Sequence, residues 1–266
     1  MKLKNPLPVI IVLICVLVLA ISVAVIYTFV NRPEDPTIQT TEKAKPPTNN
    51  YRDEGFFFED GFMHYSDTPH LKGIDVSVHQ GVIDWKAVAE SGIDYAIIRA
   101  GYRGSTVGEL YEDEQFRYNL EQAKDAGIKV GIYFFSQALT TEEAVAEAKF
   151  VCELLDDTEL DFPIYYDWEY IGGRVSQISD VPLTECAISF CEEVKSQGYQ
   201  AGVYFNQEFG YYYLDLTQLQ DYHLWLAEYN ETPTFRYHFD CLQFTDSGRV
   251  DGIETDVDLN ILFLTE

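Results

Sequence analysis

Basic residues are scarce in this chain of 266 residues, since 18 Lys and Arg stand against 44 Asp and Glu, a formal net charge of −26. A chain this acidic repels a phosphate backbone, which argues against nucleic acid as a partner. The sequence also lacks a CxxC pair or a Cys/His cluster, so no structural zinc site is expected. The looped D-x-D-x-D-G run that binds calcium is missing too. We therefore expect neither a metal nor another cofactor.

One long hydrophobic run occupies residues 7–30 and follows Lys2 and Lys4. More than twenty apolar residues can cross a hydrocarbon core of ~30 Å as a helix, whereas the apolar part of a cleavable signal peptide has roughly 7–15 residues. The run therefore predicts an uncleaved transmembrane signal anchor, with residues 1–6 in the cytoplasm. Because the lysines precede the span, the positive-inside rule puts the remainder of the chain outside the cell.

Two segments separate this span from the first regular alternation. Residues 31–50 are polar and proline-rich, which predicts a disordered linker. Residues 51–70 are richer in aromatic side chains, among them Phe56, Phe57 and Phe58. They predict an N-terminal extension, a strand or hairpin packed on the main domain, with a substrate-binding aromatic strip as the alternative.

From residue 71 onward, strand and helix patterns alternate. The predicted strands are GIDVSVH, YAIIRAGY, KVGIYFFSQA, PIYYDWEY and AGVYFN, and helical patterns follow the first four. Such alternation is typical of parallel β/α units. The later segments LWLAEYN, CLQFT and DVDLNILFL look like three strands without long helices between them. Residues 71–266 therefore predict an α/β fold, an irregular TIM-like barrel of about five β/α units and about three further, partly antiparallel strands.

Two carboxylates stand at the end of the predicted strand PIYYDWEY. Asp167 and Glu169 are two residues apart, so they point to the same face. Asp75 and Asp258 lie in other predicted strands and can converge on the same barrel mouth, where reactive groups of such barrels lie. Clustered acids raise one another's pKa, which suits glycoside hydrolysis. Surface charge and metal binding remain alternatives at this point.

Six segments together resemble the glycoside hydrolase family 25 lysozymes, the Chalaropsis-type N-acetylmuramidases. They are GIDVSVHQGVIDWKAVAESGIDYAIIRAGY, AKDAGIKVGIYFFSQA, PIYYDWE, GYQAGVYFN, LWLAEY and VDLN. The resemblance implies cleavage of the β-1,4 bond between N-acetylmuramic acid and N-acetylglucosamine in peptidoglycan. It implies that Glu169 is the general acid and Asp167 its electrostatic partner, with Asp75 and Asp258 completing an acidic floor. One departure is Cys241-Leu242-Gln243-Phe244, where such enzymes often have Trp-Gln-Tyr.

Aromatic and amide side chains near the same strand ends are candidates for contacts with glycan. They are Tyr133, Tyr204, Asn206, Tyr166, Trp225, Tyr102 and Phe135. Two functions remain open. The first is a muramidase held at the cell membrane by its N-terminal helix, with its catalytic domain facing the wall and peptidoglycan glycan strands as its partner. The second is a catalytically inactive wall-binding module on the same barrel.

Overall fold

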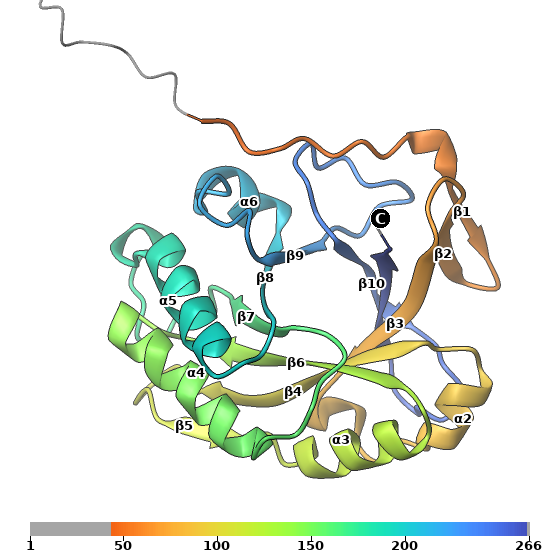
Figure 1. Cartoon of the computed structure of the whole chain (residues 1–266), viewed down its shortest axis with the longest axis horizontal. Coiled ribbons are helices and arrows are strands. Elements are labelled where there is room, and N and C mark those ends of the chain that lie inside the picture. The colour runs from red at the N-terminus through yellow and green to blue at the C-terminus, as the bar shows by residue number, and fades with distance from the viewer. Residues whose placement is uncertain (1–43, 265–266) are drawn as a thin grey trace, which may run out of the picture. The chain divides into compact units, whose positions relative to one another are not determined.

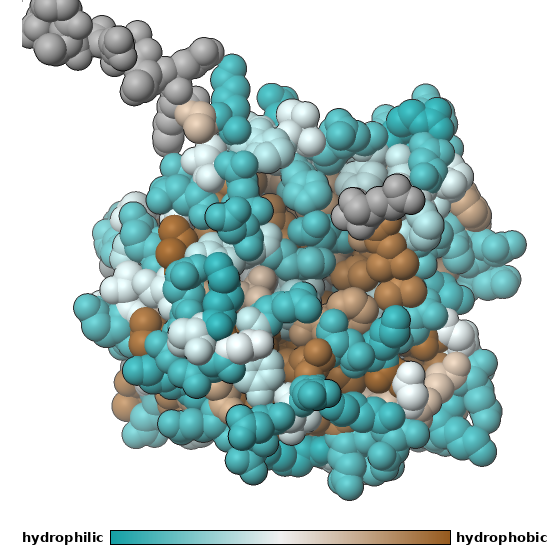
Figure 2. Space-filling view, in the orientation of Figure 1, coloured by the Kyte–Doolittle hydropathy of each residue, from teal (hydrophilic) through white to brown (hydrophobic). Residues whose placement is uncertain are grey.

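The computed structural model describes residues 44–264 of the chain. The predicted cytoplasmic segment 1–6, the predicted span 7–30 and most of the predicted linker 31–50 therefore lie outside the described residues. Within residues 44–264, no helix combines the length and the apolar character needed to cross a bilayer. Hydrophilic side chains cover most of the face seen in Figure 2, as the acidic composition leads one to expect.

The described part of the chain is organised around a closed β-barrel (Figure 1). Its strands neighbour one another in the order β3-β11-β10-β9-β8-β7-β6-β4, and pairing of β3 with β4 closes the circle. The strands are β3 (His70–Val76), β4 (Tyr95–Arg103), β6 (Lys129–Ser136), β7 (Ile164–Trp168), β8 (Ala201–Asn206), β9 (His223–Ala227), β10 (Cys241–Gly248) and β11 (Val257–Phe263). The predicted barrel is thus confirmed.

The last strand gives the barrel its irregularity. β11 runs antiparallel to both of its neighbours, β10 and β3, whereas the other barrel strands pair in parallel. The connection between β10 and β11, residues 249–256, is too short for the dozen or more residues that a parallel crossover needs. The predicted partly antiparallel end therefore follows directly from loop length.

Helices follow the first five barrel strands, and those after the first four were predicted. They are α2 (Trp85–Glu90), α3 (Phe116–Asp125), α4 (Thr141–Leu155), α5 (Leu183–Ser196) and α6 (Gln207–Tyr212), with single 3₁₀ turns at Asp53–Gly55, Val78–Gln80 and Ile178–Asp180. The predicted cap of α4 is present, since the Thr140 side chain accepts a hydrogen bond from the backbone N–H of Glu143. Helix α6 and a short strand, β5 (Leu110–Glu112), which pairs with the end of β4, were not predicted.

A hairpin covers the side of the barrel that the helices leave open. Strands β1 (Phe56–Glu59) and β2 (Phe62–Tyr65) pair antiparallel, and Figure 1 shows them beside β10 and β3. Phe62 packs edge-on against Phe244 of β10 at 5.5 Å between ring centroids, and Tyr65 packs against Phe263 of β11 at 5.7 Å. The aromatic residues of segment 51–70 thus replace missing helices as a cover for the last strands.

The predicted disorder of residues 31–50 is wrong for the end of that segment. His238 donates its backbone N–H to the carbonyl oxygen of Pro47 at 2.9 Å, and Asn49 donates to that of Arg236 at 3.1 Å. Thr48 pairs with Tyr237 as an antiparallel bridge. An extended, proline-rich segment leaves its backbone groups unpaired within itself, so the exposed backbone of residues 236–238 can pair with it.

We predict that the hairpin unfolds together with the barrel. Met63 on β2 is fully buried, so Met63→Ala should lower the free energy of unfolding of the full-length chain by about 2–5 kcal/mol in urea titrations. Phe57→Ala is the control, because Phe57 is 46% exposed and touches the barrel little; it should change stability by about 0.5 kcal/mol or less. Unchanged stability in Met63→Ala would show that the hairpin detaches independently.

Candidate active site

The four acids that the sequence singles out come together at one end of the barrel. Asp75 and Asp258 lie directly opposite each other across the β3–β11 pair. Asp167 lies near the end of β7, and Glu169 follows that strand. The negative charge of Asp75 acts on the pKa of each of the other three carboxyl groups, so all four side chains belong to one cluster.

Asp75 is the acid most firmly held by the protein. Its carboxyl group is buried, and its Oδ2 atom accepts hydrogen bonds from Gln243 Nε2 at 2.9 Å and from Asn260 Nδ2 at 2.8 Å. The Asn260 amide is itself oriented by Trp225, whose Nε1 donates to Asn260 Oδ1 at 2.8 Å. Hydrogen bonds donated to a carboxylate favour its charged form. The amide groups therefore stabilise a negative charge at Asp75 in spite of its burial.

The facing pair of acids shares protons near neutral pH. Burial raises the pKa of Asp75 to about 6, although the hydrogen bonds from Asn260 and Gln243 oppose the rise. Burial and the charge of Asp75 raise the pKa of Asp258 further, to about 8. At pH 7 the cluster thus holds a charged Asp75 beside a protonated Asp258.

Asp167 lies deeper than the sequence could show. Its side chain is 5% exposed, and its Oδ1 atom has no hydrogen-bond partner among the described residues. Burial, then Glu169 and Asp75, raise the pKa of Asp167, while Arg99 lowers it. A buried oxygen without a partner costs about 1–3 kcal/mol, so this atom keeps an unused acceptor site.

Glu169 is the half-buried acid at the outer end of the cluster. Burial and the charge of Asp75 raise its pKa, and the Tyr204 hydroxyl lowers it. Gln137 fixes the backbone here, because its Nε2 donates to the carbonyl oxygen of Glu169 at 2.7 Å. Glu169 in turn raises the pKa of Asp167, so the two acids that the sequence pairs act on each other, and Asp75 adds a further charge that acts on both.

Four of the predicted glycan contacts lie around the barrel mouth. Tyr133 and Phe135 on β6 are half-buried, and Phe135 is in register with Asp167 on β7. Tyr204 on β8 is half-buried and is in register with the same aspartate from the other side. Tyr102, near the end of β4, is half-buried and in register with Phe135. These four rings are placed to contact a ligand that reaches the acids.

Three other predicted contacts are placed differently. Trp225 is 1% exposed and lies inside the barrel, where it supports the acids from below. Tyr166 points to the outer face of β7 and packs on Phe190 of α5, because neighbouring side chains of a strand point to opposite faces. Asn206 is exposed, but its side chain caps α6. We therefore assign all three to the framework of the fold.

Sequence reasoning missed two residues that organise the cluster. Gln243 joins three groups, since its Oε1 accepts hydrogen bonds from the hydroxyls of Tyr204 at 3.0 Å and Tyr229 at 2.8 Å while its Nε2 binds Asp75. Asn260 is the second. Its position two residues after Asp258 in VDLN places both on one face, so period-two spacing was a usable signal. No comparable local signal marks Gln243.

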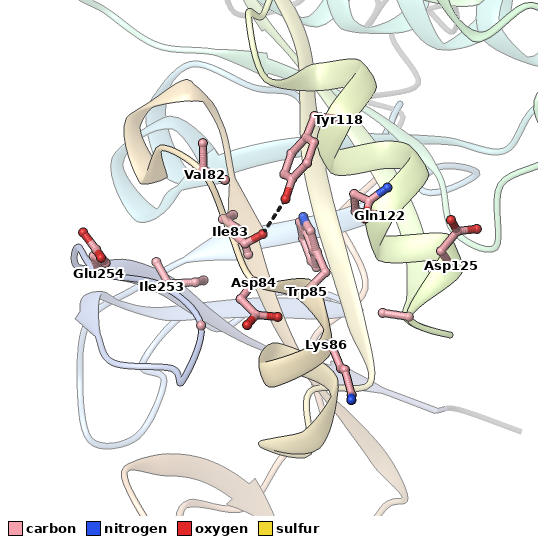
Figure 3. A pocket seen from close by; sticks show the side chains of 12 residues that line it. Val82, Ile83, Asp84, Trp85, Lys86, Tyr118, Gln122, Asp125, Ile253 and Glu254 are labelled. Carbon is pink, nitrogen blue, oxygen red and sulfur yellow. Dashed lines mark hydrogen bonds between the residues drawn. The ribbon is translucent and has the colours of Figure 1, made fainter.

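A separate hollow lies away from the acids, between α2, α3 and the β10–β11 connection (Figure 3). Its volume is about 640 Å³, and its lining includes Val82, Trp85 and Gln122 but none of the four acids. Tyr118 donates its hydroxyl to the carbonyl oxygen of Ile83 at 3.0 Å along one wall, as Figure 3 shows. This hollow therefore takes no part in the chemistry of the cluster.

The cluster has the groups that hydrolysis of a glycosidic bond requires. A half-buried carboxyl with a raised pKa can protonate a leaving oxygen, and neighbouring carboxylates can stabilise positive charge at the sugar carbon. Among residues 44–264, no group of three or more His, Cys, Asp or Glu side chains is arranged as a metal site. A β/α barrel with such an acid cluster at the strand ends is typical of a glycoside hydrolase.

The chain belongs to the glycosyl hydrolases family 25, whose family model matches residues 74–253. It is 31% identical over 192 residues to the autolytic lysozyme of Clostridium acetobutylicum, covering 71% of this chain and 55% of that protein. The modular autolysin LytC from Streptococcus pneumoniae, solved with a synthetic peptidoglycan ligand, has a TM-score of 0.65 at 27% identity, covering 78% of this chain and 52% of that one. The chain thus spans about half the length of these two relatives.

A family 25 glycosyl hydrolase from Bacillus anthracis is similar over nearly its whole length. The similarity covers 76% of this chain and 93% of that one, with a TM-score of 0.62 at 23% identity. At this identity the likeness bears on the fold alone. It supports the irregular barrel described above.

We predict that the shared proton makes the protein less stable as pH rises. Because the pKa of Asp258 is about 8 in the folded protein and about 3.9 in an unfolded chain, the folded state binds more protons between these values. Stability is then fully present below about pH 4 and is lost as pH rises through 8. Thermal melting of Asp258→Asn should therefore show a smaller loss of melting temperature between pH 5 and pH 9 than the parent shows.

The control for this prediction is Asp60→Asn, which removes one negative charge from the exposed hairpin turn. It should leave the parent's pH dependence in place. An Asp258→Asn protein whose melting temperature falls with pH as steeply as the parent's would contradict the shared proton.

Proposed function

We propose that the protein is a lysozyme, an N-acetylmuramidase that cleaves the β-1,4 bond between N-acetylmuramic acid and N-acetylglucosamine in peptidoglycan. The observation that carries the proposal is the acid cluster at the barrel mouth, in which Asp75 and Asp167 are buried and Glu169 and Asp258 are half-buried. Membership of family 25 supports the same substrate class. The similarity to the autolytic lysozyme supports it as well.

Glu169 is the general acid in this proposal. It is half-buried just beyond the end of β7, and burial together with the charge of Asp75 raises its pKa. A raised pKa makes a carboxyl better able to hold a proton that it can transfer to the leaving sugar oxygen. Gln137 holds the Glu169 backbone in place, so the acid is positioned before substrate arrives.

Asp167 and Asp75 act at the sugar carbon of the cleaved bond, whereas Glu169 acts at the leaving oxygen. The unpartnered Oδ1 of Asp167 can accept a hydrogen bond from the N–H of the substrate's 2-acetamido group. Such a bond would hold the acetamido oxygen for attack on the sugar carbon, the substrate-assisted route that the family resemblance favours. The charge at Asp75, held by two amides, would offset positive charge that develops in the transition state.

A glycan-binding module without activity is the second candidate. The structure favours the enzyme for one reason, which is that burying several carboxyl groups in one cluster costs free energy that binding alone does not require. A purely binding groove could replace the acids with amides at lower cost. The retained acids therefore support catalysis.

We also propose that residues 7–30 anchor the protein in the cell membrane, with the barrel outside and facing the wall. The proposal rests on the length of the apolar run and on Lys2 and Lys4 before it. A wall substrate fits that orientation.

Replacing Glu169 with Gln should reduce peptidoglycan clearing by at least about 10²-fold, because the amide keeps the shape but has no transferable proton. Asp167→Asn should also be severely impaired, since it alters the acceptor for the acetamido group. The measurement is clearing of purified peptidoglycan by the full-length chain, with mass spectrometry of the new reducing ends.

Thermal melting and peptidoglycan pull-down serve as controls, because both variants should fold and Glu169→Gln should still bind. A well-folded Glu169→Gln protein that clears peptidoglycan within about tenfold of the parent rate would remove Glu169 from this role. A parent that binds peptidoglycan but releases no reducing ends would favour the binding module.

The proposed topology predicts that protease added outside intact cells digests residues 51–266, because the lysines hold the other end of the span in the cytoplasm. Immunoblots against the barrel would follow the digestion, and cells opened with detergent give the complete-digestion control. Full protection in intact cells whose wall admits the protease would reverse the orientation.

A further inference from the structure

A groove of about 530 Å³ lies beside the acid cluster, between the hairpin turn and the end of β10. The hairpin contributes Phe58, Asp60 and Gly61. The other walls come from the segment after β9, from β10 with the residues after it, and from β11. They comprise Tyr229, Asn230, Glu231, Phe244, Thr245, Ser247, Gly248, Arg249 and Leu259. We call this the hairpin groove, and its volume lies in the range of about 300–1,000 Å³ usual for ligand sites.

One side chain of the hairpin groove is hydrogen-bonded to the network that holds the acid cluster. Tyr229 lines the groove, and its hydroxyl donates to Gln243, which in turn donates to Asp75. The acids also act electrostatically on this tyrosine, since Asp258 and Asp75 raise its pKa after burial does. Tyr229 is therefore the side chain that the groove shares with the hydrogen-bond network of the acids.

The lining has the composition that suits a neutral sugar. Phe58 and Tyr229 are 49% and 50% exposed, so each offers a free aromatic surface to the apolar face of a sugar ring. Small polar groups stand between them, including Thr245 and Ser247, and can bond hydroxyl or acetamido groups.

The charges of the groove disfavour an anionic occupant. Asp60 and Glu231 bring carboxyl groups to the lining. The one guanidinium there, on Arg249, is already paired with Asp256 at 2.7 Å. A negatively charged peptide would meet unfavourable charge here, whereas an uncharged sugar would not.

The hairpin also lies before the part of the chain that matches the family model. Phe58 precedes the region that matches the family model, residues 74–253. Two register shifts in β10, between Gln243 and Thr245 and between Thr245 and Gly248, bend the strand where it forms the groove wall. Phe58 then packs on this wall, with its ring 5.9 Å from that of Phe244.

We propose that the hairpin groove binds an N-acetylglucosamine, the uncharged sugar of the substrate glycan strand, beyond the two sugars at the cleaved bond, with Phe58 as a specificity-determining residue. The proposal rests on the proposed muramidase function. A sugar bound in the groove would contact the N-terminal hairpin, so that long glycan strands are better substrates than short ones.

The test compares Phe58→Ala with the parent on oligomers of alternating N-acetylmuramic acid and N-acetylglucosamine, from the shortest that is cleaved to an octasaccharide, in one series without peptides and one series with them. Loss of one aromatic contact should lower kcat/KM on the longest oligomer by about three- to tenfold and leave the shortest unchanged. The matched control is Phe57→Ala, one residue away and 46% exposed, whose ring stacks on His64 and is not part of the groove. It should behave as the parent at every length.

Three outcomes would overturn the proposal: equal rates for Phe58→Ala and the parent on the octasaccharide, a loss that is the same at every length, or a loss seen only on oligomers that carry peptides. The last would assign the groove to the peptide. If the parent cleaves none of the oligomers, the proposed function fails, and calorimetric binding of the same oligomers then decides the groove separately. Weaker octasaccharide binding by Phe58→Ala would support it, and unchanged binding would overturn it.

Discussion

The burial of the Asp75 carboxylate is the constraint on which the remainder of the site depends. A charge taken out of water must be compensated by hydrogen bonds or by an opposite charge, and here the compensation comes from the amides of Gln243 and Asn260. Asp75 lies on the first barrel strand, whereas its two partners lie on the last two. The charge of Asp75 can therefore be compensated only after the barrel has closed. The acid cluster thus reaches its final geometry when the fold is complete. Burial first, and then the charge of Asp75, raises the pKa of Asp167, Glu169 and Asp258, with Glu169 acting on Asp167 as well.

The antiparallel direction of β11 has two consequences for the same site. It places Asp258 opposite Asp75 at the barrel mouth and, two residues on, places Asn260 beneath it. It also removes the crossover helices that would cover the outer face of β10 and β11 in a regular barrel. The hairpin of β1 and β2 fills that place with aromatic side chains. Because the cover comes from a hairpin with an exposed turn, it adds a wall next to the mouth, which a crossover helix packed along the barrel side would not do.

Much of the fold could be predicted from sequence because its signals are local. Alternating strand and helix patterns predicted the five β/α units, and short connections predicted the irregular end. The acids were found in the same way, from i, i+2 spacing at a strand end and from the family resemblance. Tyr166 was mistaken for a glycan contact, although the alternation of side chains along a strand argues against that role. Asp167 and Tyr166 are neighbours and must face opposite sides of β7. Gln243 and Trp225 could not be assigned, because their roles depend on pairing between β9, β10, β11 and β3, which no local pattern specifies.

The depth of the two acids on β7 explains why they are suited to different tasks. Asp167 is inside the strand, buried, and in register with Phe135 and Tyr204, so its side chain has little freedom and one oxygen without a partner. Glu169 lies beyond the last paired residue of β7, where the chain leaves the sheet and only Gln137 holds its backbone. A proton donor must approach a leaving group and afterwards exchange its proton with water, which a half-buried position allows. A group that orients the substrate instead needs rigidity and exclusion of water, and the inner position provides both. The two-residue spacing thus separates a half-buried acid just beyond the strand from a buried acid inside it.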